Sequence, residues 1–140
     1  MKNKIFVGEF IGSALLVMAI VGSGIMAESL TNDTAVMLLA NAVATGAALY
    51  FLIVSISDIS GAHFNPFVTL AMYLSKKIKS QLLPVYFTAQ ILGCLTGVMF
   101  ANFFFDYSLI ELSSKSRSGI NVFVSEMIIT HVSVIDCILF

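Results

Sequence analysis

Four long runs of apolar residues constrain this chain more than any other feature of its sequence. They cover approximately residues 5–27, 35–57, 82–105 and 121–140. A helix needs about 20 residues to cross the roughly 30 Å hydrocarbon core of a bilayer, and each run approaches or exceeds that length. Only 11% of the residues are charged, which is too few to cover the surface of a soluble domain. The sequence therefore predicts an all-α membrane protein, with a single transmembrane domain over residues 1–140.

The basic residues predict how this domain is oriented. Five of the seven lie before the first run or between the second and third: Lys2, Lys4, Lys76, Lys77 and Lys79. The link between the first and second runs, residues 28–34, has two acidic residues and no basic one. Because lysine and arginine collect in cytoplasmic loops, we expect a cytoplasmic N-terminus, an external loop at 106–119 and a multi-pass protein of the cell membrane.

The segment between the second and third runs is too apolar for an ordinary cytoplasmic loop. Asn65 followed by Pro66 is typical of a helix start, since Asn caps free N–H groups and Pro is tolerated at the first helical position. A helix over 66–75 covers about half of the bilayer. We expect residues 60–62 before it to be extended. Non-helical backbone at membrane depth occurs only within protein or beside a water-filled cavity, so this segment predicts a re-entrant loop at a pore or substrate site.

Three motifs carry a family resemblance. Residues 60–66 read Ser-Gly-Ala-His-Phe-Asn-Pro and are followed by Val-Thr at 68–69; residues 8–12 read Gly-Glu-Phe-Ile-Gly, and residues 89–93 read Ala-Gln-Ile-Leu-Gly. In their order along the chain, and on these spans, the motifs resemble the aquaporin and glycerol-facilitator (major intrinsic protein) family over essentially the whole chain. The resemblance implies a passive channel for water and small uncharged solutes such as glycerol. It also implies a homotetramer in the lipid bilayer, with no cofactor and no enzymatic activity.

The family architecture implies an aquaporin-like bundle built from repeats of three spans and one half-helix. Residues 1–105 correspond to the first repeat and residues 121–140 to the start of the second, because 5–10 align with 122–127. The chain is therefore expected to hold about four transmembrane helices and one re-entrant half-helix. The second half-helix, with its following arginine, is absent from these 140 residues, so we expect the chain as written to be an incomplete channel that does not conduct alone.

The resemblance assigns pore-lining roles to residues around the loop. The Asn65 amide is expected to donate a hydrogen bond to a passing solute, while the half-helix dipole disfavours cations and protons. Gly61, Ala62 and His63 are expected to line the path with their carbonyl groups, and His63 also to position the loop.

Two further positions in the resemblance bear on the width of the path. Thr45 aligns with the position where the second helix of the family contributes to the selectivity constriction. Its small side chain indicates a wider path there. Phe67 replaces the usual Ala and either narrows the path or packs outward.

Four other residues are predicted to support the loops. Glu9 is an acid inside a span, and it either accepts hydrogen bonds from the re-entrant loop or reaches toward the cytoplasmic interface. Glu126 is expected to serve a second loop in the same way. Gln90 lies in the middle of a span and is expected to pack against the loop or a neighbouring helix. Pro66 is structural in every interpretation.

Other interpretations remain open at this stage. Half of a secondary transporter that assembles with another chain would need an ion-coupling carboxylate near the half-helix, and only Asp58 is close by; a non-conducting truncated protein is a further alternative. A membrane enzyme would need paired catalytic groups, such as an HExxH motif, which the sequence lacks. His63 has no second ligand at metal spacing, so we expect no metal site. The net charge of −1 says nothing about partners, but no part of the sequence resembles a basic nucleic-acid surface, so we expect no nucleic-acid partner.

Overall fold

The computed structural model describes residues 2–110, 119, 120 and 124. The described part of the chain is helical, with no strand. Its elements are α1 (Lys2–Leu30), α2 (Thr34–Ser60), α3 (Pro66–Leu74), the short 3₁₀ helix η1 (Ser80–Leu82) and α4 (Leu83–Phe104). The predicted fourth span and Glu126 lie outside the described residues.

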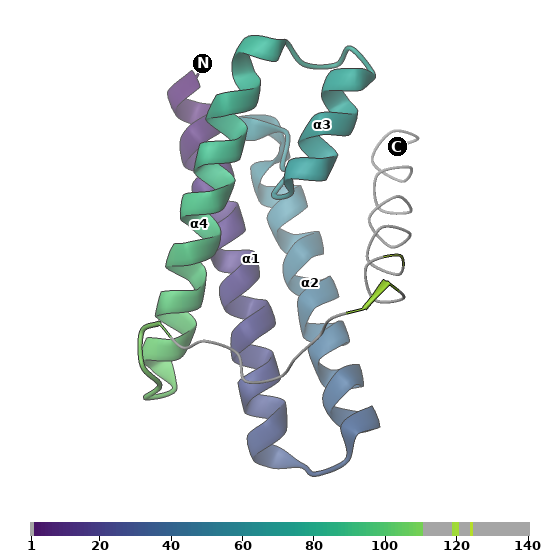
Figure 1. Ribbon diagram of the computed structural model, residues 1–140, viewed down its shortest axis with the longest axis vertical. Coiled ribbons are helices and arrows are strands. Elements are labelled where there is room, and N and C mark those ends of the chain that lie inside the picture. The colour runs from purple at the N-terminus through teal and green to yellow at the C-terminus, as the bar shows by residue number, and fades with distance from the viewer. Residues whose placement is uncertain (1, 111–118, 121–123, 125–140) are drawn as a thin grey trace.

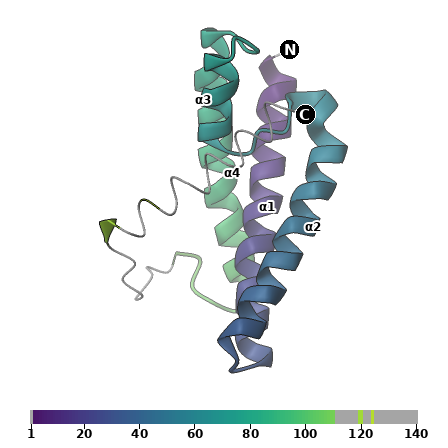
Figure 2. The same cartoon turned by 90° about the vertical axis from the view of Figure 1, so that its right-hand side faces the viewer.

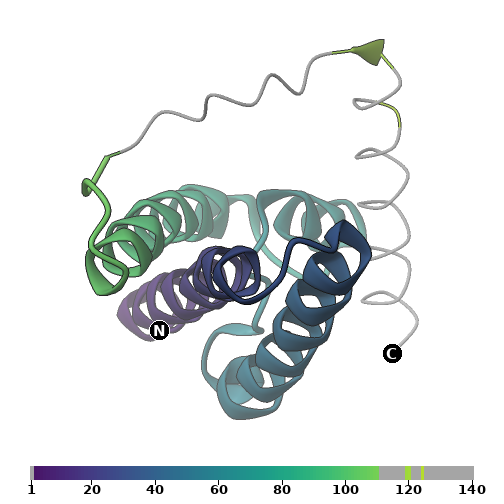
Figure 3. The ribbon, with the colours of Figure 1, turned by 90° about the horizontal axis from the view of Figure 1, so that it is seen from below.

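Three of the predicted spans are confirmed as long helices. The helices α1 and α2, and the continuous segment Ser80–Phe104, are each long and apolar enough to cross a membrane. They run side by side, and α3 lies along only one part of the bundle (Figure 1). Seen from below, α1 lies between α2 and α4 (Figure 3). The chain is therefore a multi-pass membrane protein built around α1.

Close packing of α1 and α4 depends on two glycines of α4. A Cβ atom added to Gly93 would lie 2.5 Å from the carbonyl oxygen of Phe10, and one added to Gly97 would lie 2.3 Å from that of Ala14. Both distances are too short for real Cβ contacts, so only glycine permits this approach of the two backbones. Small residues commonly allow such packing in lipid, where burial of apolar surface does not drive helices together.

The end of α2 differs from the prediction that residues 60–62 are extended. That prediction is wrong, because α2 continues to Ser60 and the chain then turns through left-handed conformations, with φ of 93° at Gly61 and 51° at Ala62. The Gly61 N–H donates to the carbonyl of Ser57 at 2.8 Å. A left-handed residue just after a helix satisfies its last carbonyl groups in this way, which is why the helix end prevails over an extended segment.

The half-helix is confirmed and is one residue shorter than predicted. It begins at Pro66 after the cap residue Asn65, whose Oδ1 accepts from the Phe67 N–H at 2.8 Å. It ends at Leu74, and Lys76 then reverses the chain with φ of 58°. Figure 2 shows α3 beside α4, along only part of the length of that helix.

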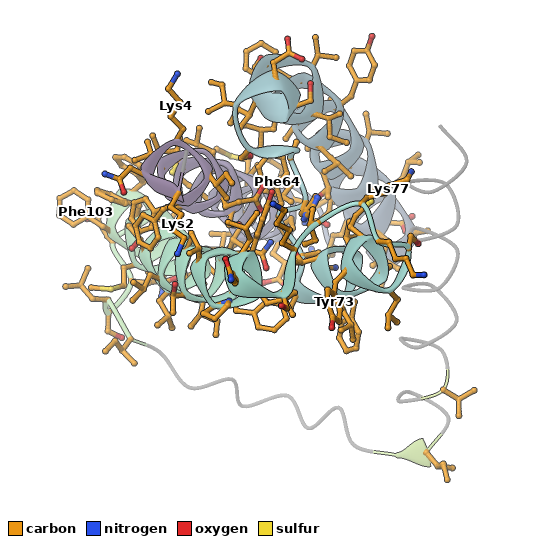
Figure 4. All side chains as sticks on the ribbon, turned by 90° about the horizontal axis from the view of Figure 1, so that it is seen from above. Lys2, Lys4, Phe64, Tyr73, Lys77 and Phe103 are labelled. Carbon is orange, nitrogen blue, oxygen red and sulfur yellow. The ribbon has the colours of Figure 1, made fainter. Side chains whose placement is uncertain are left out.

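The two basic segments predicted to share one side of the membrane lie at the same end of the bundle. The N-terminus of α1 and the link from α3 to α4 are both at the top of Figure 1, and the turn between α1 and α2 is at the opposite end. Viewed from above, Lys2, Lys4 and Lys77 lie around this end (Figure 4). This arrangement agrees with the charge pattern, and the side of the membrane that this end faces stays a prediction.

Candidate functional site

The carboxylate of Glu9 is the centre of the polar site. The residue is 0% exposed, although it lies on a membrane-spanning helix. Its Oε1 accepts hydrogen bonds from the Ser60 hydroxyl at 2.8 Å and the His63 N–H at 3.0 Å. Its Oε2 accepts from the Phe64 N–H and from Gln90 Nε2, both at 2.8 Å. Glu9 therefore joins the end of α2, the loop and α4, and does not reach toward the interface.

The number of these donors explains how a carboxylate is accommodated inside the bundle. An ionised carboxylate offers about four lone-pair positions and donates nothing. Four donors occupy them here, two from the loop backbone and two from side chains. Burying such a group is costly unless it is fully hydrogen-bonded, so the loop conformation and the buried acid stabilise each other.

Thr69 on α3 is a second polar centre; the sequence analysis placed it in a motif but assigned it no role in the site. It is 0% exposed, and its Oγ1 has three neighbours. These are Gln90 Nε2 at 2.9 Å, His63 Nδ1 at 3.0 Å and the carbonyl oxygen of Asn65 at 3.1 Å. The remaining amide oxygen of Gln90 is buried without a partner among the described residues. Thr69 thus links the half-helix to the loop histidine and to α4.

Tyr86 is another contributor that sequence reasoning missed. Its hydroxyl donates to the carbonyl of Ser60, and its ring stacks on His63 with centroids 4.5 Å apart and planes 15° apart. Tyr86 and Gln90 are four residues apart on α4 and therefore lie on one face of that helix. This spacing from Gln90 is the signal in the sequence that indicates Tyr86.

Gly8 and Gly12 of α1 leave the space that the loop occupies. A Cβ added to Gly12 would lie 1.9 Å from the Phe64 ring, and one added to Gly8 would lie 2.8 Å from Cβ of Ser60. The Phe64 side chain is buried in the middle of the bundle, as the view from above shows (Figure 4). The sequence motif around Glu9 therefore combines an acceptor for the loop with the space that the loop needs.

The loop turns its N–H groups inward. The Ala62 N–H donates to the Ser60 hydroxyl at 3.2 Å, and the next two N–H groups donate to Glu9. The carbonyl oxygens of Gly61, Ala62 and His63 accept no hydrogen bond from the described residues. Within the described residues these oxygens have no partner, and the Ala62 and His63 side chains are buried.

Pro66, Phe67 and Thr45 complete the set of residues selected from the sequence. Pro66 takes the first position of α3, and Phe67 is 63% exposed, so its ring is outside the buried cluster. The Thr45 hydroxyl oxygen is shielded and has no partner among the described residues. Thr45 precedes Ser60 by about 22 Å along α2 at 1.5 Å per residue, so the structure does not bring it to the Glu9 cluster.

Comparison with known proteins gives a family match over nearly the whole chain. The family model described as Major intrinsic protein matches residues 1–139. The chain is 43% identical over 120 residues to aquaglyceroporin AqpS of Rhizobium meliloti (strain 1021), covering 86% of this chain and 52% of that protein. It is 32% identical over 133 residues to the probable aquaporin TIP2-2 of Oryza sativa subsp. japonica, covering 91% and 52%.

A third relative matches over a shorter stretch of the chain. Aquaporin A of Dictyostelium discoideum is 39% identical over 94 residues, which cover 67% of this chain and 34% of that protein. The chain thus spans about half, or less, of the length of these relatives. Because the family match extends over nearly the whole chain and includes the helix that bears Glu9, the re-entrant loop and α4, this chain belongs to the major intrinsic protein family.

Proposed function

We propose that this chain contributes to a passive membrane channel for water and small uncharged solutes such as glycerol. The observation that carries the proposal is the re-entrant loop, whose backbone N–H groups bind the buried Glu9 carboxylate while its carbonyl oxygens stay free. Such a loop presents a fixed row of acceptors. The names of the relatives, aquaporin and aquaglyceroporin, agree with water and glycerol as solutes.

The proposed path combines acceptors and one donor. The carbonyl groups of Gly61, Ala62 and His63 accept hydrogen bonds from the solute. The Asn65 side chain uses its oxygen to cap α3, so its NH₂ group is left to donate to a solute oxygen. The N-terminus of α3 adds a positive dipole end, which disfavours cations. A small neutral solute with both donors and acceptors fits this arrangement best.

Thr45 and Phe67 are proposed to shape the path. Thr45 lies further along α2 toward the opposite end of the bundle, where a small side chain leaves a wider constriction. Phe67 is exposed at the first turn of α3 and is proposed to flank the path. Pro66 starts the half-helix, and Gln90 supports the loop from α4.

The setting of the channel is also a proposal. We infer a location in the cell membrane with the N-terminus in the cytoplasm, because five basic residues gather at that end of the bundle. A homotetramer and a loop-supporting role for Glu126 rest on family membership alone.

The experiment is stopped-flow osmotic swelling of lipid vesicles. The 140-residue chain and a version extended with the second repeat of a related channel are reconstituted at equal protein density. We expect the extended version to raise water and glycerol permeability well above that of protein-free vesicles. Asn65→Asp, which places a carboxylate in the path, is expected to lower both permeabilities.

Two results would contradict the proposal. One is swelling of the extended version at the rate of protein-free vesicles. The other is glycerol uptake that requires an ion gradient and is lost on Asp58→Asn, since this outcome indicates a coupled transporter. Dependence on a gradient is tested by repeating the glycerol measurement with and without a sodium or proton gradient.

A further inference from the structure

We propose that Thr69 holds His63 in the tautomer with hydrogen on Nδ1, so that Nε2 is a hydrogen-bond acceptor for water or a solute hydroxyl group. The assignment of the tautomer follows from counting hydrogens around one buried oxygen. The use of Nε2 by a solute rests on the proposed channel function. Thr69 is in this view a positioning residue that acts through His63.

The first step concerns the amide of Gln90. One of its terminal atoms lies 2.8 Å from the Glu9 carboxylate and 2.9 Å from Thr69 Oγ1. A carboxylate accepts hydrogen bonds and cannot donate, so the atom facing it is the NH₂ nitrogen and not the amide oxygen. The two hydrogens of that nitrogen serve Glu9 and Thr69. Thr69 Oγ1 therefore accepts from Gln90.

The second step concerns the single hydrogen of the Thr69 hydroxyl. The carbonyl oxygen of Asn65, 3.1 Å away, is only an acceptor. If the hydroxyl donates to it, the remaining contact, His63 Nδ1 at 3.0 Å, requires that Nδ1 donates to Thr69. If the hydroxyl instead donates to Nδ1, two acceptor oxygens face each other with no hydrogen between them. Only the Nδ1–H tautomer satisfies all three contacts.

The third step concerns the other ring nitrogen. In a neutral imidazole one nitrogen donates and the other accepts, so Nε2 has a free lone pair. It lies 3.2 Å from the position that a Cβ atom of Gly61 would take, and Gly61 is exposed. The stacked ring of Tyr86 fixes the plane of the imidazole. Nε2 thus lies beside Gly61, the first residue of the loop, and is a further acceptor at this end of the loop.

A protonated ring is disfavoured by burial and by the absence, among the described residues, of an acceptor for a second N–H group. His63 is buried at membrane depth, where an ionised side chain is costly. In addition, the described residues provide no hydrogen-bond acceptor for an Nε2–H group.

The test is solid-state NMR of ¹⁵N-labelled histidine in the full 140-residue chain, reconstituted in phospholipid vesicles. The chain has two histidines, so a His131→Asn background leaves His63 as the only source of signal. We expect a protonated Nδ1 and an unprotonated Nε2. Thr69→Ser keeps the hydroxyl and should keep this pattern. Thr69→Val keeps the shape, removes the acceptor for Nδ1–H, and should shift the tautomer ratio about fivefold toward Nε2–H, the factor expected for one lost hydrogen bond.

Three outcomes overturn the proposal. They are hydrogen on Nε2 in the starting protein, hydrogen on both ring nitrogens at neutral pH, and an unchanged ratio in Thr69→Val. If Thr69→Val does not fold, the spectrum of the starting protein and of Thr69→Ser still decides the tautomer. The NMR result is independent of solute flux: a normal spectrum in a protein that gives no swelling would reject the channel and leave the tautomer standing.

Discussion

The carboxylate of Glu9 on α1 accepts a hydrogen bond of 2.8 Å from the side-chain amide of Gln90 on α4, 81 residues further along the chain. The same carboxylate accepts two N–H groups of the loop that precedes α3. The buried Glu9 carboxylate thus holds α1 close to α4 and also holds the loop in its path. Changes at this site should affect loop and bundle together.

Glu9→Gln is expected to lower the free energy of unfolding by about 2 kcal/mol or more. The substitution replaces one carboxylate oxygen with an NH₂ group, so two of the four donors lose their acceptor, and each unsatisfied buried group costs about 1–3 kcal/mol. Thermal unfolding in detergent, followed by circular dichroism, measures the change. Asp58→Asn, at an exposed acid near the end of α2, is the matched control and should behave like the starting protein. Equal stability of the Glu9 variant would contradict the role given to this carboxylate.

Gly12→Ala is expected to destabilise the chain by about 1–3 kcal/mol, the usual cost of overpacking. The new methyl group would lie 1.9 Å from the Phe64 ring, which is buried and held by the loop. Gly46→Ala is the control, since nothing lies within 4 Å of its added Cβ and alanine favours the helix. Chemical unfolding of both variants in mixed micelles tests the prediction. It fails if the two substitutions have the same effect.

Tyr86→Phe should cost about 1 kcal/mol of unfolding free energy. The variant loses the hydrogen bond from the hydroxyl to the Ser60 carbonyl but keeps the ring that stacks on His63. Tyr86→Ala should cost more, because the stacking and the buried area are lost as well. The comparison is Tyr50→Phe, at a largely exposed tyrosine of α2, which is expected to be neutral. A neutral Tyr86→Phe would show that the hydroxyl does not hold the end of α2.

The orientation predicts which side chains react with a membrane-impermeant maleimide in intact cells. In a background without Cys94 and Cys137, Asn32→Cys in the turn between α1 and α2 should be labelled from outside. Ser80→Cys in the link before α4 should be labelled only after the cells are permeabilised. Both positions are exposed, so accessibility within the protein does not decide the result. The reverse pattern would mean that the basic end of the bundle faces outward.

Features that depend on neighbouring residues could be predicted from the sequence. The lengths of the spans follow from continuous apolar runs, and the structure confirms three of them. The start of α3 follows from Asn65 and Pro66, because capping and the fixed φ of proline act within one turn of helix. The prediction for residues 60–62 failed because a left-handed residue after a helix also acts within one turn, and Gly61 and Ala62 take this conformation at the end of α2.

Only the tertiary structure decided how the polar groups are satisfied. The sequence marked Glu9 and Gln90 as costly groups inside spans, but not which donors and acceptors they meet. Ser60 and Gln90 reach Glu9 across 51 and 81 residues, and Thr69 meets Gln90 across 21. Such contacts depend on helix rotation and on the space left by glycines, which local propensity does not specify. A buried hydrogen bond also depends on the position of both partners within a few tenths of an ångström, so packing of the helices, and not the order of residues, assigns its members.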